Sequence, residues 1–220
     1  MIADLAGTGV DRPGDGRGRT SYSAALTSTG LMTRCNVMQI HWAEAEVIFE
    51  FISHTGVTDW DRVVLWGESC SPPVPAGEEL AVPVDVKQPR LAAPEGAVIA
   101  STLAAAKSNR REPYKGVIAR GGLVSYRSVL DSPFVHVPHD ALPINVFRAG
   151  DLPDVWAHLA PKPLRLEGLV DGANRRVTGE KLAKALQPVT EAFKKGGLVV
   201  KEDYTPDAEL AKWIVEQLKK

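Results

Sequence analysis

One serine in this chain has the setting of a nucleophile at the end of a strand. The apolar residues of 62–66 predict a short strand, and Gly67-Glu68-Ser69-Cys70-Ser71 follows it directly. A nucleophile on such a sharp turn needs small residues two positions before and after it, because the strained backbone leaves no room for larger side chains. Gly67 is small, and Ser71 replaces the usual second glycine. We predict that Ser69 is a nucleophile and that the Cys70 N–H stabilises an oxyanion; a plain strand-to-loop turn is the alternative.

A nucleophilic serine requires a base, and the chain offers few histidines for this role. His136 and His139 are the only histidines on a loop predicted to follow the carboxyl end of a strand. We predict His139 as the base, with a structural histidine as the alternative. With Asp131 or Asp140, the same histidines would supply nitrogen and oxygen donors to a metal. They form no known ligand signature, so we expect no metal and no cofactor.

The elements around these residues alternate between strands and helices. Apolar residues spaced three and four apart predict helices, and short β-branched runs closed by glycine predict strands. The predicted helices cover 36–54, 95–107, 179–193 and 206–218, the strands 62–67, 116–120, 162–170 and 197–202, and a helical turn 126–130; 7–23, 72–94 and 125–153 read as irregular connections. This order predicts an α/β fold, a mostly parallel sheet flanked by helices on both faces. Sites in such sheets lie beyond the carboxyl ends of the strands.

Two expectations concern burial. The strand at 62–66 is expected to be buried on both faces, because its apolar residues are consecutive. The helix at 36–54 is expected to cover a core with the residues that recur at steps of three and four, which are Val37, Ile40, Ala43, Val47, Ile48 and Phe51.

The composition indicates one soluble globular domain over residues 1–220. With 26 basic and 27 acidic residues, no field of one sign draws the chain to nucleic acid or an acidic membrane, and a small-molecule partner is expected. Cys35 and Cys70 are too few for a disulfide framework, although one bridge between them stays open. The chain as written has neither a secretory signal nor a membrane span, which favours the cytoplasm unless a longer parent protein is secreted.

Four stretches of the chain share the order of elements in a known superfamily. They are Asp4-Leu5-Ala6-Gly7-Thr8-Gly9, the strand and turn of 62–69, Arg120-Gly121-Gly122-Leu123-Val124-Ser125-Tyr126, and Leu159-Ala160-Pro161-Lys162-Pro163-Leu164 followed by Asp171. Together they resemble the α/β-hydrolase superfamily, and within it the acetyl-xylan-esterase-like esterases. The likeness covers most of the chain in element order, and its specific parts are the turn at Ser69 and the Ala-Pro-x-Pro-Leu stretch.

The resemblance implies a hydrolase-like domain that lacks its first strands. Three or so strands would precede Met1, and the exposed sheet edge at 1–5 would favour a homodimer. The resemblance places the orienting acid at Asp171, for which a turn aspartate is the alternative. It also places the histidine after the last strand, where 201–207 contains none, so His139 would be a relocated base.

The favoured function is hydrolysis of a carboxylic ester by Ser69, His139 and Asp171, with the Cys70 N–H as oxyanion donor. A carbohydrate ester is one substrate class that this function would include. A degenerate, non-catalytic hydrolase-like domain that binds a ligand or partner is the first alternative. A serine peptidase on the same fold is the second. The basic pair Arg175 and Arg176 would grip a carboxylate, or else be a solvated approach to the next helix.

Overall fold

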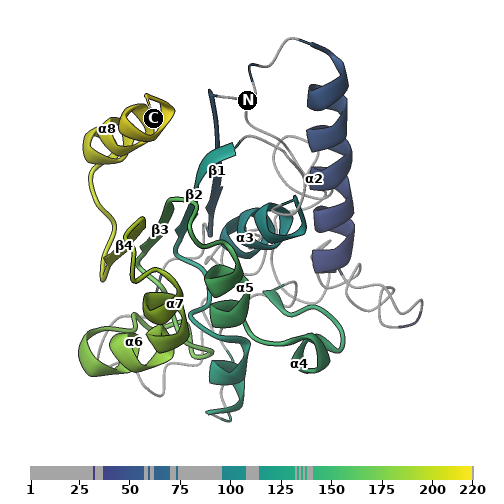
Figure 1. Ribbon diagram of the computed structural model, residues 1–220. Coiled ribbons are helices and arrows are strands. Elements are labelled where there is room, and N and C mark those ends of the chain that lie inside the picture. Colours follow the sequence, from purple (N-terminus) through teal and green to yellow (C-terminus); the bar gives the residue numbers. More distant parts are fainter. Residues whose placement is uncertain are drawn as a thin grey trace.

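The computed structural model describes residues 32, 37–56, 59, 62–69, 73, 96–107, 114–131, 133, 135, 137 and 141–219. Its sheet consists of β1 (Val63–Glu68), β2 (Tyr114–Arg120), β3 (Leu164–Glu167) and β4 (Leu198–Lys201). The four strands are parallel and lie side by side in the order of the sequence (Figure 1). The predicted α/β class with a parallel sheet is therefore confirmed.

Helices cover both faces of this sheet. They are α2 (Val37–His54), α3 (Gly96–Lys107), the 3-10 helix η5 (Tyr126–Leu130), α4 (Val146–Ala149), α5 (Leu152–His158), α6 (Gly179–Ala185), α7 (Gln187–Ala192) and α8 (Asp207–Leu218). Figure 1 shows α8 on one side of the sheet and α2 and α3 on the other. None of the helices within the described ranges is long and apolar enough to cross a membrane.

The alternation of side chains along the strands divides the interior into two layers. Val117 and Ala119 of β2 and Leu166 of β3 belong to the larger core, which they share with α3, α5 and α7. Ile118 points to the opposite face, where it packs with Leu210 and Trp213 of α8. The apolar layer under α8 is small, so much of that face is available to the polar residues described below.

Most predicted elements match the structure within two residues, but four predictions are wrong, two about elements and two about burial. The stretch 125–153 is not wholly irregular, because it contains α4 and the start of α5. Asp151 and Asp154 form a capping box there, and Pro153 is tolerated in the first turn, where no helical N–H is required. The single helix predicted at 179–193 is two helices that meet at Leu186, since Pro188 cannot donate a helical hydrogen bond.

The other two wrong predictions concern burial. Trp66 of β1 is 46% exposed, so this strand is not buried on both faces. In α2, Val47 and Phe51 are each 68% exposed, whereas Met38 and Phe49 are buried. Apolar residues occur on more than one side of α2, and the spacing alone therefore did not select the buried side.

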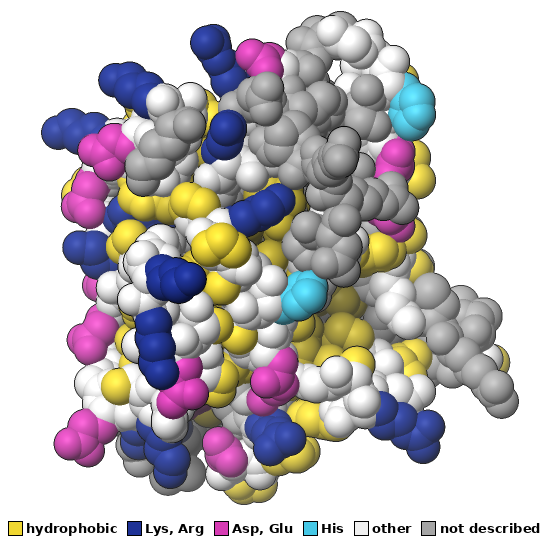
Figure 2. Space-filling model, viewed as in Figure 1, with side chains coloured by type: hydrophobic (Ala, Val, Ile, Leu, Met, Phe, Trp, Pro, Cys, Tyr) yellow, Lys and Arg dark blue, Asp and Glu magenta, His cyan; other side chains and the backbone are white. Residues whose placement is uncertain are grey.

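Charges of both signs are mixed over the surface. Figure 2 shows basic and acidic side chains interspersed across the face in view, over α6, α7 and α8. The arrangement agrees with the near-zero net charge of the chain.

Candidate functional site

The carboxyl ends of the strands present a row of charged side chains. Glu68, Arg120, Glu167 and Lys201 are register partners across the four strands. Arg120 lies between two acids, with Nη1 3.6 Å from Glu68 and Nε 3.4 Å from Glu167. Glu167 is fully buried, so its charge needs the partners that surround it.

Glu167 fixes the loop that leaves β4. Its carboxylate accepts hydrogen bonds from Arg165 Nε at 2.5 Å, from the Thr205 hydroxyl at 2.7 Å and from the Thr205 N–H at 3.2 Å. Arg120 adds a hydrogen bond of 2.8 Å to the Thr205 carbonyl and an ion pair of 3.2 Å with Asp207. The first turn of α8 and the residues before it are thus tied to the sheet.

Ser69 lies one residue beyond β1, where the sequence predicted a nucleophile. It is only 3% exposed, and its N–H donates to the Arg120 carbonyl at 2.8 Å. Its own carbonyl faces the Tyr204 hydroxyl at 3.4 Å. The backbone of Ser69 therefore has a contact on each side, one from β2 and one from the loop after β4.

The helix that meets this strand end is α3. A Cβ added at Gly67 would lie 1.8 Å from the Gly96 carbonyl oxygen, and one added at Gly96 would lie 2.5 Å from the Glu68 carbonyl oxygen. The two backbones are in such close contact that each position requires glycine. The start of this 12-residue helix, with its partial positive charge, thus lies against the end of β1 and next to Ser69.

Asp171 lies beyond β3, at the same edge of the sheet as Ser69 but with β2 between their strands. Its Oδ1 accepts the N–H groups of Ala173 at 2.9 Å and of Arg175 at 3.0 Å. The turn is completed by Asn174, whose φ of 57° is in the left-handed region. The turn role considered for Asp171 is therefore present, and a second role as the orienting acid stays a prediction.

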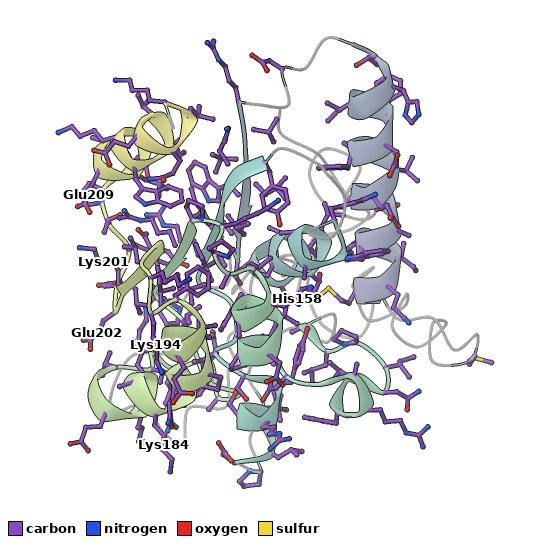
Figure 3. All side chains as sticks on the ribbon, viewed as in Figure 1. His158, Lys184, Lys194, Lys201, Glu202 and Glu209 are labelled. Carbon is purple, nitrogen blue, oxygen red and sulfur yellow. The ribbon has the colours of Figure 1, made fainter. Side chains whose placement is uncertain are left out.

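The other predicted site residues, Cys70, His136 and His139, lie outside the described residues. Three described histidines are on helices. His41 and His54 belong to α2, and His158 ends α5, six residues before β3 begins at the amino edge of the sheet (Figure 3). His158 therefore belongs to the helix that precedes β3. Within the described ranges, no group of three or more His, Cys, Asp or Glu residues could hold a metal ion.

Sequence reasoning missed Tyr204, which lies where the resemblance expected a histidine. Its ring is held between two guanidinium groups, with Arg120 Cζ 4.4 Å and Arg176 Cζ 4.3 Å from the ring centroid. Burial raises the pKa of the Tyr204 phenol, against the opposing effect of Arg176. The contact between Tyr204 and Ser69 depends on the path of the loop after β4, which the sequence does not show. The absence of a histidine after the last strand was the one feature that drew attention to this loop.

The guanidinium of Arg176 makes its contacts within the protein. Besides the Tyr204 ring, its guanidinium contacts the Gly168 carbonyl and lies 3.4 Å from Asp203. These contacts disfavour the carboxylate-gripping role considered for this arginine. Other charged pairs nearby are exposed, such as Lys201 and Glu209, which are 3.8 Å apart (Figure 3).

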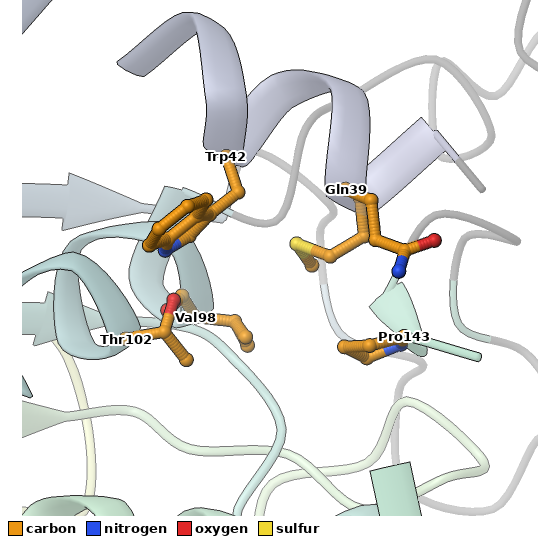
Figure 4. A pocket seen from close by; sticks show the side chains of 6 residues that line it. Gln39, Trp42, Val98, Thr102 and Pro143 are labelled. Carbon is orange, nitrogen blue, oxygen red and sulfur yellow. The ribbon is translucent and has the colours of Figure 1, made fainter. Parts of the chain in front are cut away.

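A cavity lies between α2, α3 and the segment before α4. Its volume is about 320 Å³, and Met38, Gln39, Trp42, Val98, Thr102 and Pro143 line it (Figure 4). The Thr102 hydroxyl donates to the Val98 carbonyl at 2.8 Å within its own helix. The lining is therefore mainly apolar, and the volume falls in the range of small-molecule sites.

No protein-family model, curated protein or solved structure is significantly similar to this chain. The resemblance to the α/β-hydrolases therefore rests on the residues quoted above.

Proposed function

We propose that this protein is a serine hydrolase that cleaves a small-molecule carboxylic ester, with Ser69 as its nucleophile. The position of Ser69 supports this proposal most directly. It is buried one residue beyond β1, at the carboxyl edge of a parallel sheet, and the start of α3 packs against the glycine two residues before it. Strand end, serine and helix start together are the arrangement that a nucleophile turn requires.

The proposed reaction follows the logic of the serine triad. The Ser69 hydroxyl attacks the ester carbonyl and passes its proton to His139, which Asp171 orients. The Cys70 N–H binds the oxyanion of the tetrahedral intermediate. Collapse of this intermediate breaks the ester bond, the alcohol leaves with the proton from the histidine, and water then hydrolyses the acyl-enzyme.

Hydrolysis of p-nitrophenyl acetate tests this function. We expect turnover by the wild type and a loss of at least about 1,000-fold in Ser69→Ala, as is usual when a nucleophile is removed. Ser101→Ala is the matched control, because Ser101 is also buried but its hydroxyl bonds the Ala97 carbonyl and the Trp156 indole within the core. Equal rates in wild type and Ser69→Ala, or no rate in either, would refute the esterase.

The apolar cavity supports the second candidate, a hydrolase-like domain that binds a ligand without cleaving it. Trp42 lines the cavity, so its fluorescence reports an occupant. A saturable fluorescence change with a medium-chain fatty acid, lost in Trp42→Phe, together with no reaction of Ser69 with a fluorophosphonate, would favour this candidate. A peptidase would instead cleave p-nitroanilides faster than the matching nitrophenyl esters.

We also propose a homodimer through an exposed edge of the sheet. The edge expected at 1–5 lies outside the described residues, so the proposal is argued from β1. Among the described strands β1 is at the end of the order, and its Trp66 is 46% exposed. Light scattering after size exclusion tests this contact. A dimer that Trp66→Lys converts to a monomer would support it. The protein is measured at about 100 µM, a concentration on the order of the Kd of a weak dimer, and a wild type that is monomeric there would refute it.

A further inference from the structure

The loop after β4 brings an aromatic hydroxyl onto the peptide that the proposed reaction uses. The Tyr204 hydroxyl lies 3.4 Å from the Ser69 carbonyl oxygen, a long contact compared with the usual O–H···O distance of about 2.5–3.0 Å. The Ser69 N–H donates a hydrogen bond of 2.8 Å to the Arg120 carbonyl. The guanidinium of Arg120 also packs on the Tyr204 ring. Arg120 therefore contacts both Ser69, through its carbonyl, and Tyr204, through its side chain.

Several independent features hold Tyr204 in this place. A Cβ at Gly121 would lie 1.9 Å from the Tyr204 hydroxyl, and one at Gly168 would lie 2.6 Å from the Tyr204 ring. Both glycines have positive φ, of 80° and 56°, and both sit directly after a strand. The next residue, Thr205, is bonded through its N–H and its hydroxyl to the buried Glu167. The ring thus lies in a space that two glycines open and is anchored by the residue that follows it.

The contact bears on the oxyanion donor through the geometry of the peptide bond. A trans peptide is planar and carries its N–H anti to its carbonyl. A hydrogen bond to the Ser69 carbonyl therefore also fixes the direction of the N–H that follows it. In the proposed reaction that N–H belongs to Cys70 and binds the oxyanion.

We propose that Tyr204 is a positioning residue that orients the Ser69–Cys70 peptide, and through it the oxyanion donor. This proposal rests on the proposed esterase function. Tyr204 follows the last strand, where the resemblance expected a histidine base. Its proposed role is to position a peptide and not to accept a proton.

The chemistry of the phenol agrees with this task. Burial raises the pKa of Tyr204 above its ordinary value of 10.0. The hydroxyl therefore keeps its proton at neutral pH, as a donor to a carbonyl must, and it does not act as a general base there.

One NMR signal reports the contact without any need for activity. Ser69-Cys70 is the only Ser-Cys pair in the chain, so ¹³C-carbonyl serine with ¹⁵N-cysteine gives a single carbonyl-to-amide cross-peak for this peptide. We expect Tyr204→Phe, which keeps the ring and removes the hydroxyl, to move this cross-peak. Tyr114→Phe is the matched control, because it removes a buried hydroxyl bonded to the Ala104 carbonyl at the opposite end of β2. It leaves the cross-peak in place.

Kinetics per fluorophosphonate-titrated site test the consequence. Tyr204→Phe lowers kcat about 3- to 10-fold with KM unchanged, the effect of losing one modest hydrogen bond, whereas Tyr114→Phe lowers the melting temperature and leaves kcat unchanged. An unmoved cross-peak in Tyr204→Phe overturns the proposal, as does a moved cross-peak with wild-type kcat. A wild type without esterase activity refutes the proposed function and with it the catalytic role of Tyr204. The cross-peak then still tells whether the contact exists, so the two failures are distinguishable.

Discussion

At the scale of single residues, Ser69 was predictable and its surroundings were not. The small residues after a β-rich run identified the serine, because a strand end and its turn are local features. Tyr204 could not be found in this way, since 135 residues separate it from Ser69 along the chain. Its place depends on the sheet register and on the ion pairs of Arg120 and Glu167, which the sequence does not display.

The raised pKa of Tyr204 predicts a loss of stability in alkali. The unfolded chain binds fewer protons than the folded one once the pH passes the ordinary tyrosine pKa of 10.0, so the free energy of unfolding falls as the pH rises above that value. Below it the phenol is protonated in both states and contributes no pH dependence. We expect the difference in unfolding free energy between the wild type and Tyr204→Phe, measured by urea denaturation from pH 8 to 11, to move in favour of the variant above pH 10. A constant difference over this range would contradict the shift.

Asp171→Asn separates the turn role of Asp171 from its proposed catalytic role. The amide keeps an oxygen that can accept the N–H groups of Ala173 and Arg175, so the unfolding free energy changes by less than about 1 kcal/mol. An orienting acid is lost with the charge, and esterase turnover falls at least about 100-fold, less than the change in a well-formed triad. Urea denaturation and ester hydrolysis measure the two effects. An active variant of wild-type stability would leave Asp171 with the turn role alone.

At the scale of elements, most of the fold followed from local patterns. Alternating strands and helices gave the α/β class, and the helix starting at the end of the proline-rich stretch 72–94 proved to be α3. The short α4 and α5 were missed because their signals are caps and one proline rather than periodicity. The buried side of α2 was also missed, since it depends on Lys107 of α3.

Lys107 joins α3 to α2. Its side chain is 1% exposed, contacts Glu50, lies 3.3 Å from Glu46 and 5.3 Å from the centre of the Phe49 ring. We expect Lys107→Met to lower the unfolding free energy by about 1–3 kcal/mol, because two acids lose a buried partner but keep part of their own hydration. Lys201→Met is the control and costs at most about 0.5 kcal/mol, since Lys201 is 45% exposed and 3.8 Å from its partner Glu209. Equal losses in the two variants would contradict the account of the α2–α3 contact.

Gly67 holds β1 against the start of α3. Its substitution by alanine brings a Cβ to 1.8 Å from the Gly96 carbonyl oxygen, which is backbone and has to move. We expect Gly67→Ala to cost more than about 2 kcal/mol and to slow the reaction of Ser69 with a fluorophosphonate. Gly56→Ala is the control: its Cβ meets nothing within 4 Å, and only its φ of 65° opposes alanine, at a cost of about 1 kcal/mol. A folded Gly67→Ala that reacts at the wild-type rate would show that the helix contact does not shape the turn.

At the scale of the whole molecule, the parallel sheet explains why distant residues meet. The strands end at one edge, so Ser69, Gly121, Gly168 and Tyr204 come together although they follow four different strands. Sites in parallel α/β sheets lie beyond the carboxyl ends of the strands, so this edge could be predicted from the order of elements. Which residues contact one another there depends on side-chain packing and could not. The central claim is that this edge carries a reactive serine.

Labelling by a fluorophosphonate tests that claim most directly. The folded protein is incubated with the probe, digested, and its peptides are analysed by mass spectrometry, with urea-unfolded protein and Ser69→Ala as controls. Our account predicts one equivalent of label per chain, on the Ser69 peptide of the folded wild type and in neither control. No label on folded protein, or label on another serine that persists in Ser69→Ala, would contradict it.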